Sequence, residues 1–148
     1  MIALPDEAAT QALGAALAGP ARRGHVIALH GPLGAGKTTL ARGLIRALAG
    51  NDEEVVSPTF TLVQAYDTAT IPIWHFDLYR LDKPEDAFEL GLEEALAAAI
   101  TVIEWPERLG TLIPANRLDV TLTASGNGRQ AELVYRGVGG SPWANVRL

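Results

Sequence analysis

The sequence contains no cysteine. This excludes disulfide bonds, thiolate zinc sites and a cysteine nucleophile. It also lacks any apolar stretch approaching the ~20 residues of a membrane span, since the longest candidate covers only residues 95–103. The first residues have neither a basic region nor a long apolar core, so no signal peptide is expected. We therefore expect a cytoplasmic protein that does not associate with membranes.

Positive charge is also scarce. Twelve Lys and Arg residues stand against 17 Asp and Glu residues, and the net charge is −5. A protein that grips a nucleic-acid backbone by itself usually has a basic patch, whereas here the local basic pair is only Arg22 and Arg23. Direct, independent nucleic-acid binding is therefore disfavoured. Lysine is especially rare, because only Lys37 and Lys83 are lysines.

One of these lysines lies in the segment around which the chain is organised. Residues 31–38 read Gly-Pro-Leu-Gly-Ala-Gly-Lys-Thr, the G-x-x-x-x-G-K-[ST] pattern of a phosphate-binding loop. Glycine lets the backbone approach phosphate oxygens closely, and a helix N-terminus there carries roughly half a positive charge. We expect Lys37 to bridge the outer phosphates, Thr38 to hold Mg²⁺ and Thr39 to contact the inner phosphate.

The loop stands between a predicted strand and a predicted helix, as this pattern requires. Residues 26–29 form a short apolar run before it. After it, residues 39–49 place Leu40, Leu44 and Leu48 at helical spacing and end at a glycine. This context and the scarcity of lysine disfavour the alternative, which is a chance match in a glycine-rich chain.

The other elements predict a single α/β domain over residues 1–148. We expect a P-loop NTPase-like three-layer sandwich with a mostly parallel central sheet and an antiparallel hairpin. The tail from about residue 137 has little periodicity and is expected to be loosely ordered. Helices are predicted over 5–18, 84–90, 92–99 and 107–112, and strands over 60–66, 71–79, 100–103, 118–123 and 130–136.

Two acids are placed to complete a phosphate site. Glu104 follows the buried strand 100–103, and ligands bind at the carboxyl ends of strands in open α/β sheets. Its alternative role is a strand-end charge that faces solvent. Asp77 lies within an aromatic-rich strand, where a carboxylate is costly unless it is paired or binds metal. Its alternative role is a salt bridge to Arg80 or to another arginine.

Hydroxyl groups and a histidine surround these acids in the sequence. Ser57, Thr59 and Thr61 flank Pro58 and form either a switch segment that senses a γ-phosphate and Mg²⁺ or an ordinary strand of β-favouring residues. His75 shares a strand face with Asp77. It is either a catalytic histidine or a structural one.

Taken in this order, the motifs resemble the TsaE (YjeE) family of bacterial ATPases, which act in tRNA threonylcarbamoyladenosine biosynthesis. The resemblance covers most of the chain, and the tail matches least. It rests on Pro5-Asp6-Glu7 with Thr10, residues 31–39, Ser57 to Val63, His75 to Leu81, Glu104-Trp105-Pro106 and Gly128-Arg129.

The resemblance implies an Mg²⁺-dependent ATPase that works with TsaD and TsaB subunits to modify the adenosine next to the anticodon in ANN-decoding tRNAs. The tRNA would reach it indirectly, through these partners. Catalytic roles are implied for Lys37, Asp77 and Glu104, with Thr38 and Glu104 as metal ligands and Trp105 as a nearby aromatic. The implied nucleotide-binding residues are Thr10, Gly34, Ala35, Gly36, Lys37, Thr38, Thr39 and Arg129, and the switch-like ones are Ser57, Thr59 and Thr61.

Two other functions share the same loop. A small-molecule P-loop kinase would need an acceptor pocket and usually an Arg-bearing lid, and the sequence has no Arg-rich insertion. A nucleotide-gated binding module would bind ATP with negligible turnover. The sequence contains no clear arginine finger that would stabilise the transition state, and Arg80 is the nearest candidate. We therefore expect slow ATP hydrolysis by the isolated protein and stimulation by a partner complex.

Overall fold

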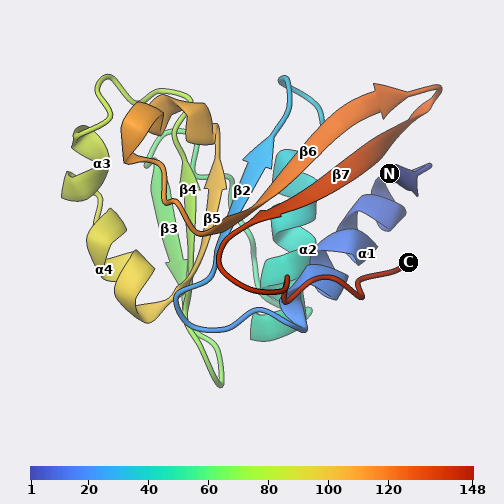
Figure 1. Cartoon of the computed structure of the whole chain (residues 1–148), viewed down its shortest axis with the longest axis horizontal. Coiled ribbons are helices and arrows are strands. Elements are labelled where there is room, and N and C mark those ends of the chain that lie inside the picture. Colours follow the sequence, from blue (N-terminus) through green and yellow to red (C-terminus); the bar gives the residue numbers. More distant parts are fainter.

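A seven-stranded mixed sheet forms the centre of the molecule (Figure 1). The structure is a computed structural model and describes residues 1–148. The strands are arranged across the sheet in the order β1-β7-β6-β2-β5-β4-β3. Their bounds are Ile2–Leu4 (β1), Val26–His30 (β2), Val63–Tyr66 (β3), Ile73–Asp77 (β4), Ile100–Glu104 (β5), Arg117–Ser125 (β6) and Gly128–Arg136 (β7).

The parallel pairs form the middle of this sheet. β2 pairs in parallel with β5 and with β6, and β4 pairs in parallel with β5. The antiparallel pairs lie at the two sides: β3 with β4 at one, and β6 with β7 and β7 with β1 at the other. Parallel pairing brings the carboxyl ends of β2, β4 and β5 to one edge of the sheet, where loops form sites in this class of fold. The predicted α/β fold with a parallel core is confirmed.

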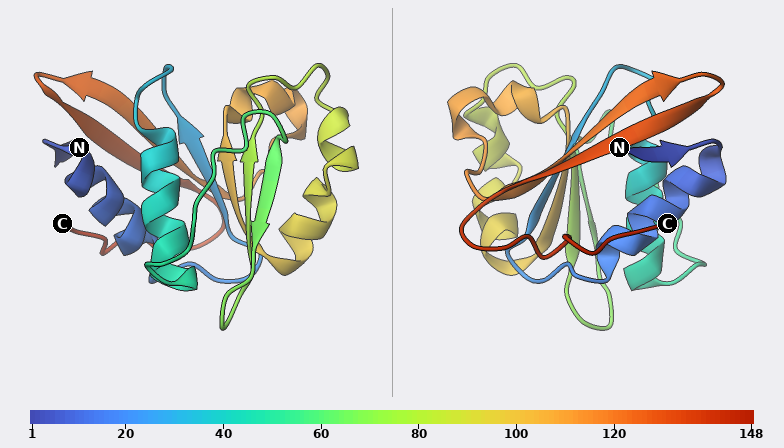
Figure 2. Two further views of the ribbon diagram at one scale, coloured as in Figure 1. Left: turned by 180° about the vertical axis from the view of Figure 1, so that it is seen from behind. Right: turned by 45° about the vertical axis from the view of Figure 1, so that its right-hand side comes forward.

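Helices cover the sheet from two sides (Figure 2). α1 (Glu7–Ala18) and α2 (Lys37–Ala49) contribute to the larger hydrophobic core. α3 (Asp86–Glu89), α4 (Leu92–Ala98) and the 3-10 helix η1 (Pro106–Leu112) contribute to a smaller one. Successive residues of a strand point to opposite faces of the sheet, so the central strands contribute to both cores. Val102 faces the larger core, and Ile103 faces the smaller one. None of the helices combines the length and apolar character needed to cross a membrane.

The two helices of the larger core approach each other closely at two glycines. A Cβ atom at Gly14 would lie 2.1 Å from the Leu40 carbonyl oxygen, and one at Gly43 would lie 2.1 Å from the Gln11 carbonyl oxygen. Only a residue without a side chain fits at either position. The contact therefore fixes α2 against α1, and with it the loop at the N-terminus of α2.

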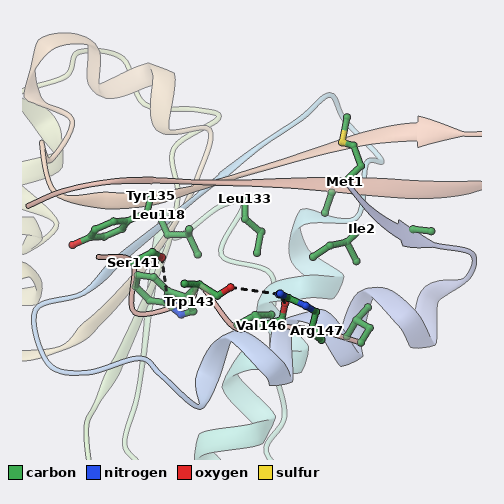
Figure 3. A pocket seen from close by; sticks show the side chains of 13 residues that line it. Met1, Ile2, Leu118, Leu133, Tyr135, Ser141, Trp143, Val146 and Arg147 are labelled. Atoms are coloured by element: carbon green, nitrogen blue, oxygen red, sulfur yellow. Dashed lines mark hydrogen bonds between the residues drawn. The ribbon is translucent and has the colours of Figure 1, made fainter. Parts of the chain in front are cut away.

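The C-terminal tail, which was expected to be loosely ordered, contacts the domain through Trp143. Trp143 is 3% exposed, and its indole Nε1 donates a hydrogen bond to the Leu17 carbonyl oxygen at 2.9 Å. Its ring packs against His25 and Tyr135, with ring-centroid distances of 5.0 and 6.1 Å. A single buried tryptophan removes enough apolar surface from water to hold a segment that shows no periodicity. A groove of about 620 Å³ lies between the tail, β1 and β7 (Figure 3).

Two other segments differ from the prediction. Residues 2–4 form the edge strand β1, paired with β7, where no strand was predicted. A three-residue strand shows too little alternation to be recognised in a sequence. β3 begins only at Val63. Residues 60–62 form a loop instead, and Leu62 has a positive φ of 69°.

Candidate functional site

The glycine-rich loop joins β2 to α2 at the edge where the parallel strands end. Gly31 cannot be replaced without displacing backbone, because a Cβ there would lie 2.6 Å from the Leu122 carbonyl oxygen. Gly36 precedes the helix with φ 103°, a left-handed conformation that favours glycine. The first helical hydrogen bond runs from the Leu40 amide to the Gly36 carbonyl at 2.9 Å. The preceding amides of the first turn therefore have no helical acceptor and can bind an anion.

Lys37 is the first residue of α2 and is only 5% exposed. Its Nζ donates to the Gly31 carbonyl oxygen and, at 3.5 Å, to that of Pro32. The ammonium also lies 3.4 Å from the ring centroid of Trp105, a cation–π contact. Burial lowers the pKa of Lys37 below its ordinary value, and the nearby carboxylates partly oppose this shift. The ammonium is thus held at the loop by carbonyl oxygens and an aromatic face.

Thr38 and Glu104 form an oxygen pair beside this lysine. The Thr38 hydroxyl lies 3.1 and 3.0 Å from the two carboxylate oxygens of Glu104. Glu104 ends β5 and is 2% exposed, so it does not face solvent as its alternative role required. Oxygen donors at a helix N-terminus suit Mg²⁺, which takes one or two protein oxygens and fills its other positions with water and phosphate. The pair therefore fits a magnesium ion.

Asp77 lies next to Glu104 across the β4–β5 pairing. Its carboxylate accepts hydrogen bonds from the Tyr79 amide at 3.1 Å and the Thr59 hydroxyl at 3.4 Å. Burial raises the pKa of Asp77, the Tyr79 amide opposes this, and the Glu104 charge adds to the rise. No salt bridge to Arg80 forms; that guanidinium lies over the Phe60 ring instead, 4.8 Å from its centroid.

The hydroxyl segment meets the site through two of its three predicted residues. Ser57 and Thr59 face the loop, and their hydroxyl oxygens lie 2.8 Å apart. Thr61 is exposed and donates to the Val63 carbonyl oxygen at 3.2 Å, so its side chain does not reach the site. The contact of Thr59 with Asp77 links the segment to β4.

Two neighbouring cavities border the loop, with volumes of about 270 and 360 Å³. They share Gly34, Gly36 and Thr39. The first holds the lysine, the hydroxyls and both acids, and the second holds Thr10 and Arg129. The first is lined by residues 33–39 and by Ser57, Thr59, Asp77, Glu104 and Trp105, and the second also by residues 4–7, Asn127 and Gly128.

Arg129 closes the loop from the second cavity. Its guanidinium Nη2 donates to the Gly34 carbonyl oxygen at 2.9 Å. Thr10, on α1, is 3% exposed and lies against Gly36. The structure therefore brings together all the predicted site residues except Thr61.

Two contacts of the site were not predicted. His75 lies 2.7 Å from a Glu104 oxygen, and the Trp105 ring covers Lys37. The face shared by His75 and Asp77 was visible in the sequence, but the β4–β5 pairing that sets His75 beside Glu104 was not. Trp105 has a positive φ of 56°, which is unusual for a bulky residue and which alternation patterns do not reveal.

A glycine-rich loop after a central parallel strand, with an acid at the end of the next parallel strand, defines a P-loop α/β protein. The sequence model of one family, "Threonylcarbamoyl adenosine biosynthesis protein TsaE", matches residues 4–131. The chain belongs to the TsaE family.

Individual relatives agree with this assignment. The chain is 41% identical over 119 residues to the tRNA threonylcarbamoyladenosine biosynthesis protein TsaE of Rickettsia bellii, covering 80% of this chain and 83% of that protein. It is 43% identical to the TsaE of a Nostoc species, covering 89% and 83%. The crystal structure of Bacillus subtilis YdiB superposes with a TM-score of 0.75 at 29% identity, covering 89% of this chain and 82% of that one.

Proposed function

We propose that this protein is the Mg²⁺-dependent ATP-binding and ATP-hydrolysing subunit of a machinery that adds threonylcarbamoyl to the adenosine next to the anticodon of ANN-decoding tRNAs. It would act with TsaD and TsaB subunits, and tRNA would reach it through them. The family assignment and the names of the relatives support the pathway. The arrangement of Lys37, Thr38 and Glu104 in one cavity at the start of α2 supports the chemistry.

Each group in this cavity has a role that its position allows. The free amides at the start of α2 and the Lys37 ammonium would bind the β- and γ-phosphates. Thr38 and Glu104 would hold Mg²⁺, which when bound neutralises charge that develops on the phosphate oxygens. Burial raises the pKa of Asp77, so its carboxylate is a stronger base than that of an ordinary aspartate. It would orient the attacking water or accept a proton from it.

The second cavity would take the part of the nucleotide beyond the phosphates. It opens from the same glycines, so a ligand bound at the loop can extend into it. Thr10 and Arg129 line it from α1 and β7. Their hydroxyl and guanidinium groups are hydrogen-bond donors that suit a ribose or a base edge.

The metal assignment gives a first prediction. Glu104→Ala should weaken Mg²⁺-dependent ATP binding on the order of 100-fold or more, because losing only an outer partner of a metal ligand already costs about 10–100-fold. Binding of ATP in EDTA should change little, since the amides and Lys37 remain. Calorimetric titrations of ATP with and without Mg²⁺ measure both quantities.

Glu107→Ala is the matched control for this prediction. The negative charge of Glu107, like that of Glu104, raises the pKa of Lys37, but Glu107 lines neither cavity. Its loss removes the same charge without removing an oxygen ligand, so the Mg²⁺ dependence should be kept. An equal loss of metal-free and metal-dependent binding in Glu104→Ala would make Glu104 a structural residue.

The contact between Lys37 and Trp105 gives a second prediction. Binding of Mg-ATP should draw the ammonium from the indole face towards phosphate, so the tryptophan fluorescence should change. Trp105→Phe should remove this response. Trp74 packs against the smaller core, and Trp143 anchors the tail in the larger core. Trp74→Phe and Trp143→Phe should therefore retain the response. A response that survives in Trp105→Phe would contradict the role of Trp105 as reporter.

A further inference from the structure

His75 is the most deeply buried titratable side chain beside the site. It lies on β4, is 0% exposed and lines neither cavity. Its Nε2 lies 2.7 Å from Oε2 of Glu104. A histidine in this position cannot touch a nucleotide bound at the loop. Its hydrogen bond connects it to the site through Glu104, and a charge on its ring also lowers the pKa of the neighbouring Asp77.

The direction of this hydrogen bond follows from the chemistry of the two groups. A carboxylate that binds metal is ionised, and an ionised carboxylate only accepts hydrogen bonds. Nε2 of His75 must then carry the hydrogen. Nδ1 is buried without any hydrogen-bond partner. The neutral Nε2–H tautomer leaves only a lone pair unmatched there, whereas a hydrogen on Nδ1 would be a buried, unpaired donor.

The Glu104 carboxylate is held from two sides. In the strand register His75 pairs with Val102 and Asp77 pairs with Glu104. The imidazole therefore starts two register positions before Glu104, on the side away from the end of the strand. The Thr38 hydroxyl contacts both carboxylate oxygens from α2. The strand backbone fixes the position of the Glu104 Cα atom but not the torsion angles of its side chain. These two partners supply that restraint.

We propose that His75 is a positioning residue, which holds the Glu104 carboxylate through an Nε2–H hydrogen bond in the orientation that binds Mg²⁺. This inference rests on the proposed function, because it takes the Glu104 and Thr38 oxygens as the metal-binding pair. Outer partners of metal ligands typically contribute about 10–100-fold to metal affinity. His75 should contribute to Mg²⁺ affinity by this amount and hardly at all to metal-free nucleotide binding.

Two substitutions at His75 separate positioning from packing. His75→Gln retains an N–H donor near the position of Nε2, whereas His75→Leu fills the space without a donor. ATP binding is titrated by calorimetry in EDTA and at increasing Mg²⁺. We expect His75→Leu to lower the apparent Mg²⁺ affinity about 10–100-fold with unchanged binding in EDTA, and His75→Gln to recover most of it. No change in His75→Leu, or an equal loss with and without metal, would overturn the proposal.

His30→Leu provides a matched control for His75→Leu, because it also removes the imidazole without leaving a donor. His30 Nε2 lies 2.7 Å from Asp119 Oδ1, the same distance as between His75 and Glu104. The Asp119 carboxylate also accepts hydrogen bonds from Nε of Arg117 at 2.9 Å and from Nε of Arg136 at 2.6 Å. This variant removes a histidine–carboxylate contact that does not involve the metal-binding pair. Its Mg²⁺ affinity should match that of the unchanged protein, and a loss equal to that in His75→Leu would overturn the proposal.

Nitrogen NMR of the unchanged protein tests the inference even if a His75 variant does not fold. The imidazole of His75 should show the neutral Nε2–H tautomer, and Mg-ATP should shift its resonances more than those of His25 and His30. An Nδ1–H tautomer would overturn the positioning role. Absence of ATP binding by the unchanged protein would refute the proposed function instead, and the tautomer would then still decide whether His75 donates to Glu104.

Discussion

Replacing Lys37 by alanine should lower ATP turnover by about 10²–10³-fold, the loss typical when one preorganised group that stabilises transition-state charge is removed. Lys37 is the only cationic side chain among the 12 residues that line the first cavity. No other side chain of this cavity supplies a positive charge beside the outer phosphates. ATP affinity should fall as well, because the ammonium contacts phosphate before the reaction.

The fold should survive this substitution. Burial already disfavours the charged form of Lys37, as its lowered pKa shows, and its Nζ contacts only carbonyl oxygens of the loop and the Trp105 ring. Circular dichroism and thermal unfolding check this point, while calorimetry and single-turnover assays measure the functional loss. Lys83→Ala is the matched control, because Lys83 is the only other lysine and is exposed. Unchanged affinity and turnover in a folded Lys37→Ala would sink the assignment of the loop.

The loop could be recognised in the sequence because its chemistry is local. Gly31, Gly36, Lys37 and Thr38 act through backbone conformation and side-chain type within one short segment, and the structure places that segment between a strand and a helix as predicted. Glu104 could be located for a similar reason. An apolar strand followed by an acid marks the carboxyl edge of a sheet wherever the strand lies within it.

Contacts between distant segments could not be predicted in the same way. His75 contacts Glu104 only because β4 lies beside β5. The sequences of the two strands do not indicate that they are neighbours in the sheet. The tail is ordered by the hydrogen bond and packing of Trp143 against α1 and β7, which lie far from it in the sequence. The cluster of hydroxyl residues around Pro58 likewise did not reveal that Thr61 lies in the loop before β3 and bonds to the Val63 carbonyl oxygen.

The positions of the arginines bear on how fast the isolated protein can hydrolyse ATP. Arg80 lies over the exposed Phe60 ring and outside the first cavity. Arg129 lies in the second cavity and is bound to the Gly34 carbonyl. The first cavity therefore has no arginine to stabilise charge on the transferred phosphoryl group. A finger supplied by a partner protein is worth about 10³–10⁵ in rate in other nucleotide hydrolases.

The segment around Thr59 is suited to couple such a partner to the nucleotide. Ser57 and Thr59 line the first cavity, while the adjacent Phe60 is 82% exposed. One short stretch thus joins the phosphate site to the surface. Contacts of this stretch with a γ-phosphate would favour the docked state, and hydrolysis would release it.

We therefore expect slow ATP hydrolysis by the isolated protein and an acceleration of about 10³–10⁵-fold when the TsaD and TsaB subunits dock. Thr59→Ala should lose most of this stimulation, because its hydroxyl joins the segment to Asp77. Thr61→Ala should keep it, because the Thr61 hydroxyl bonds only to the Val63 carbonyl. Steady-state ADP production, measured for each protein with and without the subunits and tRNA, gives the comparison. Fast turnover by the isolated protein, indifferent to the subunits, would refute this gating and favour a small-molecule kinase, whose ADP production would depend on an acceptor.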